Sequence, residues 1–335
     1  MKKQKFVLVN ALPLDIVSGG NVYNQNLCAA FANKGIEMDY FYTKEIEKTI
    51  LGLDEESIIL VDSFCLNEKV NWINLLNRKI ILLLHLAPSA DDQKNTEKRN
   101  EIIEVEKFVF KSFPIITAGK KAIEYIETNY NFHVDSYQIV PPAISSSWIK
   151  KANYNLLPKK LLVIGTITER KGYKRLIEAL SLLKETDWIC DCYGSISDTT
   201  LMQEITRLIK ENGLENRIQF LGTIDNSKMN LLQTTYDLLV QLSDEENNSV
   251  ALMEAIASGL PFISTPTGNH HYYKENKCGF VTSGFESETI AKEIRPVLEE
   301  PKTYELLVQS LSTIAPNTWD KNIDTILNFT KKLWN

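Results

Sequence analysis

Short apolar runs alternate with amphipathic stretches along all 335 residues of the chain. Runs rich in valine, isoleucine and leucine on both faces are typical of strands in a parallel sheet that helices cover. The predicted strands of the first half are Phe6–Val9, Met38–Tyr42, Ile58–Asp62, Ile80–His85, Ile115–Thr117 and Gln138–Val140. The alternation starts again in the second half, at Lys160–Gly165, Trp188–Tyr193, Ile218–Leu221, Leu238–Leu242, Phe262–Ser264 and Phe280–Thr282.

Amphipathic helices are predicted between these strands, notably at 21–33, 96–111 and 120–129. The stretch 141–158 contains three prolines and a run of serines, so it is the best candidate for a linker. We therefore predict an α/β protein of two doubly wound Rossmann-like domains, residues 1–150 and 151–317, facing each other across a cleft. A last amphipathic helix, about 318–333, completes the chain.

The stretch Leu238–Pro261 is the most informative part of the sequence. It predicts a buried strand, a polar turn and then a helix over 249–258, at whose start Asn247, Asn248 and Ser249 supply capping side chains. A helix start at the carboxyl end of a strand favours a bound anion. The carboxylates of Glu246 and Glu254 would repel that anion unless they bind ligand hydroxyls. A phosphate beside hydroxyls describes a sugar nucleotide, and an ordinary strand–turn–helix unit is the alternative.

The spacing Ser-x-x-Glu-x7-Glu-Ala-x-Ala-x-Gly-x-Pro resembles the signature of the retaining GT-B glycosyltransferases of family 4, glycosyl transferases group 1. The matching positions are Ser243, Glu246, Glu254, Ala255, Ala257, Gly259 and Pro261. Asn247 stands where the family usually has glycine. Because asparagine tolerates the left-handed backbone better than most residues, we expect the turn to survive. The resemblance covers nearly the whole chain, and its specific positions lie between residues 160 and 282. It implies that the last helix returns to the N-terminal domain, which would then comprise 1–150 and 318–335.

A second element runs from Gly165 to Gly172, after the first strand of the second domain. A cation at a strand end suits a diphosphate, whose negative charge must be neutralised before it can leave, and a charged surface loop is the alternative. The element resembles the family's Gly-Arg…Lys-Gly segment, in which an arginine and a lysine hold the donor diphosphate. Lys171 matches the lysine. Thr166 occupies the arginine position, and Arg170 is the candidate replacement.

In the first half, Gly19 and Gly20 lie between a strand and a helix, where glycine lets a ligand approach the backbone closely. His85 ends a strongly apolar strand, at the sheet edge that displays functional groups. A tight turn and a structural histidine are the alternatives. The resemblance implies that the two glycines lie near the transferred sugar and the diphosphate, and that His85 contacts the donor sugar. A histidine there can donate a hydrogen bond to developing negative charge or exchange protons.

Two further loops, at Gly194 and at 222–224 with Ile224, resemble the family's nucleotide-contacting loops, which often hold the base through backbone groups. The sequence therefore does not name the nucleobase. Neither a dinucleotide fingerprint nor a Walker loop occurs. A metal site at His270 and His271 would need further ligands at suitable spacing, so we expect no metal and no cofactor.

Composition narrows the class of protein. Hydrophobic residues make up 44% and charged residues 24%, as in an ordinary soluble globular protein. The net charge of −6 gives no pull toward nucleic acid. No apolar run is long enough to span a membrane, while small lysine clusters hint at peripheral contact with an anionic membrane surface. Five scattered cysteines fit reduced thiols in a cytoplasm.

The resemblance thus implies a retaining, metal-independent transferase that works in glycan or glycoconjugate assembly. It would move a sugar from a nucleoside-diphosphate sugar, UDP first and GDP next, to a hydroxyl of a glycan, lipid-linked, protein or small-molecule acceptor. The residues implied in catalysis are Glu246, His85 and Lys171. Those implied in donor binding are Gly19, Gly20, Gly165, Thr166, Arg170, Gly194, Ile224, Asn247, Asn248, Ser249 and Glu254. A GT-B sugar-nucleotide epimerase, a non-catalytic GT-B subunit acting with a partner, and a sensing module are the alternatives. The sequence does not fix the oligomeric state.

Overall fold

The structure is a computed structural model that describes residues 5–13, 16, 18–90, 96–144, 148, 150–312 and 314–334. The chain divides into two compact units. Unit 1 comprises Met1–Ile16, Gly20–Pro142 and Thr318–Asn335, and unit 2 comprises Val17–Gly19 and Ala143–Asn317. Ala143 and Ile144, which we expected in the first domain, group with unit 2, where Ile144 N donates to Asn317 O (3.1 Å).

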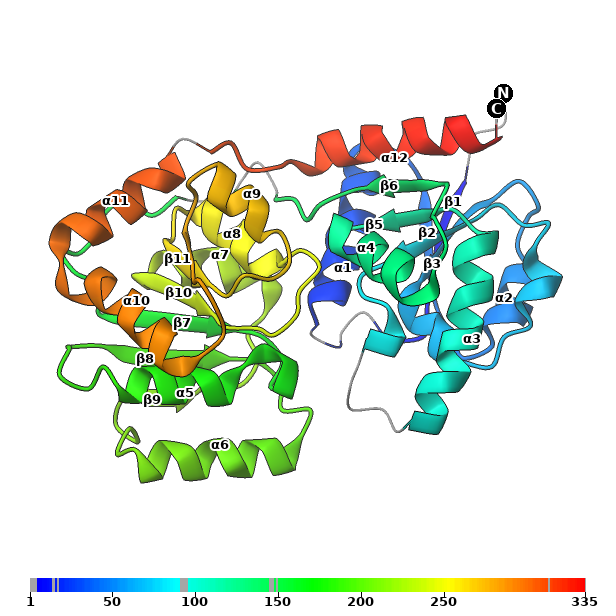
Figure 1. The fold of residues 1–335 in the computed structure, drawn as a ribbon. Helices are drawn as coiled ribbons and strands as arrows, with labels where there is room; N and C mark the ends of the chain where they lie inside the picture. Colours follow the sequence, from blue (N-terminus) through cyan, green and yellow to red (C-terminus); the bar gives the residue numbers. More distant parts are fainter. Residues whose placement is uncertain are drawn as a thin grey trace. The chain divides into compact units, whose positions relative to one another are not determined.

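Unit 1 is built on a parallel six-stranded sheet of order β2-β1-β3-β4-β5-β6 (Figure 1). Its strands are β1 (Phe6–Asn10), β2 (Met38–Tyr42), β3 (Ile58–Asp62), β4 (Ile80–Leu84), β5 (Ile115–Thr117) and β6 (Tyr137–Ile139). Strands β1, β3 and β4 are buried along their whole length, which is why they read as unbroken apolar runs. The strand order reverses between β1 and β3, and the carboxyl ends of such a pair are where doubly wound sheets bind ligands.

The helices of unit 1 include one from the C-terminal end of the chain, which follows unit 2 in the sequence. They are α1 (Gly19–Asn33), α2 (Ile46–Leu51), α3 (Thr96–Ser112), α4 (Lys120–Tyr130) and α12 (Trp319–Trp334), with short 3-10 turns η1 (Ser63–Asn67), η2 (Trp72–Leu75) and η3 (Pro88–Ala90). Helix α12 is fastened to unit 1 by an edge-to-face contact between the rings of Trp319 and Tyr23, and by a hydrogen bond from Asn322 Nδ2 to Pro141 O (2.7 Å).

Unit 2 repeats the architecture with the order β12-β11-β10-β7-β8-β9, again all parallel. Its strands are β7 (Lys160–Ile164), β8 (Ile189–Tyr193), β9 (Ile218–Phe220), β10 (Leu238–Gln241), β11 (Phe262–Ser264) and β12 (Phe280–Val281). Here the order reverses between β7 and β10. The prediction of two doubly wound parallel sheets is confirmed, and the strand ends of the described chain differ from the predicted ones by at most one residue.

Helices pack on both faces of the second sheet. They are α5 (Tyr173–Ser181), α6 (Thr199–Glu211), α7 (Asn226–Thr234), α8 (Val250–Ser258), α9 (His270–Glu275), α10 (Ser287–Glu299) and α11 (Pro301–Ser312), with a 3-10 turn η4 (Glu169–Lys171). Alternate strand residues enter different cores: Leu161 joins the cluster of α5, α6 and α10, while Leu162 joins that of α8. Cys190 and Cys192 both pack in the first of these cores, in keeping with a structural role.

Asp237 fastens the segment that leads into β7. Its carboxylate accepts hydrogen bonds from the backbone N–H groups of Lys159 (3.1 Å) and Lys160 (3.0 Å) and pairs with Lys151 Nζ (3.3 Å). Burial acts to raise the pKa of Asp237, but these donors outweigh it and the pKa stays below its usual value. The end of the predicted linker is therefore held firmly on unit 2.

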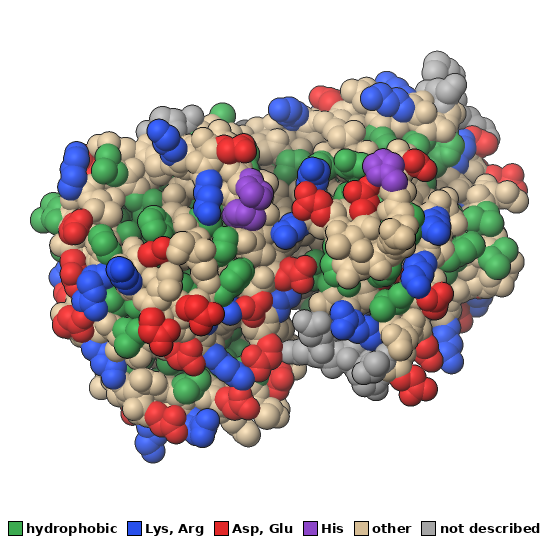
Figure 2. Space-filling model, in the orientation of Figure 1, with side chains coloured by type: hydrophobic (Ala, Val, Ile, Leu, Met, Phe, Trp, Pro, Cys, Tyr) green, Lys and Arg blue, Asp and Glu red, His purple; other side chains and the backbone are tan. Residues whose placement is uncertain are grey.

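The surface carries charges of both signs. On the face drawn in Figure 2, basic and acidic side chains are interspersed, with apolar side chains scattered between them. Within the described residues, no helix combines the length and the apolar character needed to cross a membrane.

Candidate functional site

Two adjoining loops of unit 2 follow β7 and β10, at the point where the strand order reverses. Asp244 N in the second loop donates to Arg170 O in the first (2.8 Å). Gly172 has a φ of 67°, and a Cβ there would lie 2.0 Å from Leu242 O. Only glycine fits this position, because a side chain would push the loops apart. The close approach places η4, with its cations, against the residues that follow β10.

The loops bring two cations and one carboxylate together. Glu246 Oε1 lies 2.5 Å from Lys171 Nζ and 3.4 Å from Arg170 Nη1, and it accepts a hydrogen bond from Ser243 Oγ (2.9 Å). The Glu246 side chain is 12% exposed and that of Lys171 18%. Burial acts to raise the pKa of Glu246, but attraction to Lys171 and Arg170 outweighs it, so the pKa is lower than usual. The residues predicted to hold a diphosphate thus hold a carboxylate of the chain itself.

Arg170 supplies the second cation of this cluster. Its Nη1 also donates to Glu245 O (2.5 Å), so its guanidinium is held at the second loop instead of extending into solvent. The sequence left open whether Arg170 could serve where Thr166 replaces the expected arginine. The geometry places Arg170 beside Lys171 and Glu246.

The predicted glycines of unit 2 permit close contacts between successive loops. A Cβ on Gly165 would lie 3.2 Å from Lys171 Cε, so the lysine stem lies over this glycine. A Cβ on Gly194 would lie 1.9 Å from Gly165 O, and Gly194 N donates to Gly222 O (2.8 Å). The loops after β7, β8 and β9 therefore lie against one another, with Ile224 half-buried beyond the third.

The start of α8 is capped by Ser249, one of the three residues predicted to cap it. Ser249 Oγ accepts from Leu252 N (3.3 Å) and lies 2.6 Å from Gln241 Oε1, to which it donates. Ser249 is thus the N-cap and not the first helical residue. Asn247 does not adopt left-handed backbone, because the described non-glycine residues with positive φ lie elsewhere in the chain. The turn is held instead by Glu246 N, which donates to Thr267 Oγ1 (3.0 Å).

Glu254 lies in the interior of α8 with 5% of its surface exposed. Burial raises its pKa to about 8, against a single opposing hydrogen bond from Gln233 Nε2 (3.3 Å). Gln233 Oε1 in turn accepts from Ser258 Oγ (3.0 Å). The two glutamates of the motif therefore differ in charge state, since Glu246 is stabilised as a carboxylate and Glu254 as a neutral acid near pH 7.

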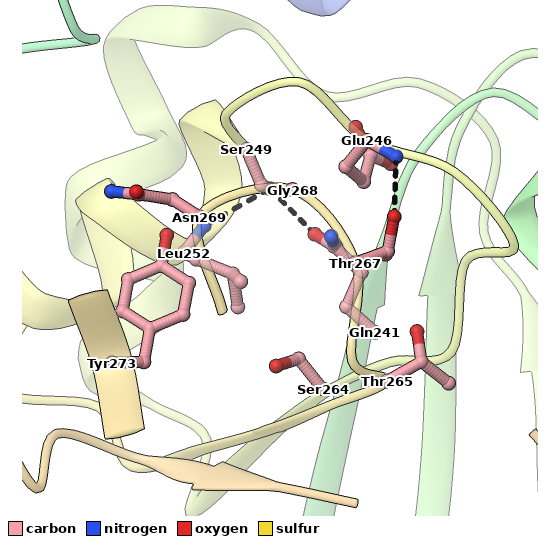
Figure 3. A pocket seen from close by; sticks show the side chains of 10 residues that line it. All are labelled: Gln241, Glu246, Ser249, Leu252, Ser264, Thr265, Thr267, Gly268, Asn269 and Tyr273. Atoms are coloured by element: carbon pink, nitrogen blue, oxygen red, sulfur yellow. Dashed lines mark hydrogen bonds between the residues drawn. The ribbon is translucent and has the colours of Figure 1, made fainter. Parts of the chain in front are cut away.

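A narrow pocket lies beside this cluster, and it is too tight to admit a water molecule (Figure 3). Two buried hydroxyls that line it, Ser264 Oγ and Tyr273 Oη, have no hydrogen-bond partner. The pocket lies where the ends of β10 and β11 meet the start of α8. It is lined by Gln241, Glu246, Ser249, Leu252, Ser264, Thr265, Thr267, Gly268, Asn269 and Tyr273.

In unit 1, His85 directly follows β4. Its Nε2 lies 3.0 Å from Asn24 Oδ1 and 3.3 Å from Asp62 Oδ2, and its side chain is 15% exposed. The predicted helix start at residue 21 is wrong: α1 begins at Gly19, so both glycines belong to its first turn. A Cβ on Gly20 would lie 3.0 Å from His85 Cδ2, so the missing side chain lets the imidazole pack against α1.

Sequence reasoning singled out most residues of the cluster but missed their partners. The structure gathers Arg170, Lys171 and Glu246, while Gly20 and His85 meet in unit 1. Thr267, Gln233, Asn24 and Asp62 were not predicted. Asp62 carried a usable signal, because it is a polar residue at the end of a buried strand; Gln233 carried none. Within the described part of the chain, no group of three or more His, Cys, Asp or Glu could hold a metal ion.

Comparison with known proteins shows which family the chain is similar to. The family described as "Glycosyl transferases group 1" matches residues 145–310. The lipopolysaccharide glucosyltransferase WaaG of Escherichia coli K12 is 27% identical over 214 residues, which cover 57% of this chain and 54% of WaaG. The chain thus spans about half the length of this curated relative.

Solved structures match over nearly the whole chain. Sucrose-phosphate synthase from Thermosynechococcus elongatus superposes with a TM-score of 0.78 at 15% identity, covering 99% of each chain. Anabaena Alr3699/HepE, solved in complex with UDP and glucose, also superposes with a TM-score of 0.78 at 14% identity, covering 98% of this chain and 100% of HepE. At these identities the likeness concerns the fold, which is GT-B. With its motif, its two doubly wound sheets and these relatives, the chain belongs to the glycosyl transferases group 1 family.

Proposed function

We propose that the chain is a retaining glycosyltransferase that moves a sugar from a nucleoside-diphosphate sugar to an acceptor hydroxyl. The observation that carries this proposal is the cluster of Lys171, Arg170 and Glu246 where the strand order of unit 2 reverses. Two cations beside the start of α8 suit a diphosphate, and a carboxylate among them suits the hydroxyls of a sugar. Ligands of doubly wound sheets bind at this edge.

In the proposed reaction, Lys171 and Arg170 neutralise the charge that develops on the leaving diphosphate. Backbone amides near Ser249 bind a phosphate, Glu246 orients the donor sugar and Glu254 binds the ribose hydroxyls. The leaving phosphate helps to deprotonate the acceptor on the same face of the sugar, so no carboxylate nucleophile is needed. Such preorganised charge and orientation each contribute several kcal/mol in a site that excludes water. Because the cations come from the protein, we expect the reaction to be independent of metal.

Donor and acceptor can be named only by class. UDP is the first candidate nucleotide and GDP the next; the complex of HepE with UDP supports this order for a chain of the same fold. The acceptor is a hydroxyl of a glycan, a lipid carrier, a protein or a small metabolite. We assign the acceptor side to unit 1, with His85 at the carboxyl edge of its sheet.

The experiment is a calorimetric titration of the wild type and Lys171→Ala with UDP, GDP, ADP and TDP, in buffer that contains EDTA. We expect one nucleotide to bind the wild type, and its affinity to fall at least tenfold in the variant, because a charge-assisted hydrogen bond contributes about 1.5–3 kcal/mol. Lys174→Ala is the control, since Lys174 is three residues further along the chain and pairs with Glu169 and Glu204 instead of Glu246. Absence of binding to all four nucleotides would overturn the proposal.

A further inference from the structure

Two threonines of the loop that follows β11, residues 265–268, hold the turn that carries Glu246. Thr265 Oγ1 donates to Ser243 O (2.5 Å), and Thr267 Oγ1 accepts from Glu246 N (3.0 Å; Figure 3). Thr265 is fully buried and Thr267 is 8% exposed. Because β10 and β11 are neighbours in the sheet, this β11 loop lies beside the turn, although Thr267 and Glu246 are 21 residues apart in the chain.

The restraint reaches the carboxylate through Ser243. While the backbone oxygen of Ser243 accepts from Thr265, its hydroxyl donates to Glu246 Oε1 (2.9 Å). The serine must be the donor here, because a carboxylate can only accept. Glu246 is therefore held at its backbone N–H by Thr267 and at its carboxylate by Ser243, and both of these depend on the β11 loop.

Gly268 lets the β11 loop approach Glu246 closely. A Cβ at Gly268, which has a φ of 61°, would lie 3.0 Å from Glu246 Cβ and 3.2 Å from Glu246 O. The loop also has a hydrogen bond of its own, from Thr267 N to Thr265 O (2.8 Å). A tight loop in direct contact with Glu246 can fix the place of that side chain.

Lys171, the cation nearest the carboxylate, is held without the β11 loop. Its backbone N donates to Thr168 O (3.1 Å), and its side-chain stem lies over Gly165. Loosening the β11 loop should therefore displace the Glu246 carboxylate and leave Lys171 where it is. In the proposed function these two groups bind different parts of the donor, so their effects on binding can be separated.

We propose that Thr265 and Thr267 are positioning residues that place the Glu246 carboxylate against the hydroxyls of the donor sugar. This step rests on the proposed function and acts through Glu246 alone. A hydroxyl–carboxylate hydrogen bond spans only about 2.5–2.7 Å, so a displacement of roughly 1 Å breaks it. The β11 loop then contributes to binding of the sugar and not to binding of the nucleotide.

The experiment compares a nucleotide with its sugar conjugates. Calorimetry with UDP, UDP-glucose and UDP-N-acetylglucosamine is run on the wild type, Thr267→Val and Thr267→Ser. For the conjugate that the wild type binds, we expect the Kd to rise about tenfold in Thr267→Val, because the sugar loses a charge-assisted hydrogen bond. The Kd for UDP should not rise. Thr267→Ser keeps the hydroxyl and should restore the wild-type values.

Thr282→Val is the matched control. Thr282 is fully buried, and its Oγ1 donates to Gly284 O (2.8 Å) after β12, the strand next to β11. Its loss removes a buried threonine hydroxyl without touching Glu246, so each Kd should stay within about twofold.

Amide hydrogen exchange of Glu246, measured by NMR with 15N-labelled glutamate, tests the contact without any ligand. We expect a protected amide in the wild type and in Thr267→Ser, and exchange about tenfold faster in Thr267→Val.

Each outcome supports or overturns the inference. Equal losses of affinity for UDP and for the conjugate in Thr267→Val would show general damage to the site and overturn it. Unchanged affinities, an unprotected Glu246 amide in the wild type, or no rescue by Thr267→Ser would also overturn it. If Thr267→Val does not fold, Thr265→Val gives the same comparison. A wild type that binds no nucleotide refutes the proposed function itself, whereas binding without the expected split refutes only the role of the two threonines.

Discussion

Removing the charge of Glu246 should tighten the binding of the free nucleotide while it stops sugar transfer. In the structure this carboxylate pairs with Lys171 Nζ (2.5 Å) and Arg170 Nη1 (3.4 Å). A diphosphate that binds Lys171 and Arg170 must therefore displace the Glu246 carboxylate from them. In Glu246→Gln no carboxylate has to be displaced, and the neutral amide does not repel the phosphates.

The size of the effect follows from the geometry. One charge-assisted hydrogen bond contributes about 1.5–3 kcal/mol, and the lower value applies because the Arg170 side chain is 35% exposed. At 1.4 kcal/mol per tenfold change, the Kd for UDP should fall roughly tenfold. Transfer should drop by at least 100-fold, because Glu246 is proposed to orient the donor sugar.

The assay is calorimetry with UDP at low and high salt, with transfer rates measured in parallel. Asp244→Asn is the matched control: it removes one charge from the same loop, but Asp244 pairs with Arg175 and its side chain is 49% exposed. Its Kd should change by less than twofold. Weaker UDP binding by Glu246→Gln would refute the reasoning, because it would mean that the carboxylate supports nucleotide binding.

Two further changes test the site through stability. Glu254, whose pKa is raised to about 8 by burial, retains its proton on folding while the unfolded chain loses it above about pH 4.5, so stability falls as pH rises between these values. The free energy of unfolding of Glu254→Gln should therefore rise relative to that of the wild type by about 1.4 kcal/mol per pH unit. Urea titrations at pH 5, 6.5 and 8 measure this difference, and a difference that does not widen with pH would contradict the assignment. Gly172→Ala should destabilise unit 2 by more than the 1–2 kcal/mol of left-handed strain and weaken UDP binding, since its Cβ would meet Leu242 O at 2.0 Å. Gly213→Ala, with a φ of 64° and open space around it, measures the strain alone in the same thermal melts, and equal losses in both variants would count against the loop contact.

The two sheets could be predicted from the sequence because a buried strand can be recognised from its own residues. The fully buried β3 and β4 are continuous apolar runs, and each turn after a strand carries the polar residues that its exposed backbone needs. The Glu-x7-Glu spacing likewise identified Glu246 and Glu254, since both belong to one strand–turn–helix unit. Gly19 and Gly20 were found as well, but their place inside α1 was not, because glycine is a poor helix former and reads as loop.

What the sequence by itself determined, then, is the two doubly wound sheets and the residue types at their carboxyl edges. Only the tertiary structure decided which of these residues meet: Lys171 and Glu246 are 75 residues apart, and Asn24 and His85 are 61 apart. It also gave Glu246 and Glu254 opposite pKa shifts, although the motif treats them alike. The physical reason is that hydrophobic periodicity reports which side of an element faces water, a local property. Partners and charge states depend on strand order and on desolvation, which arise only when the whole sheet is assembled.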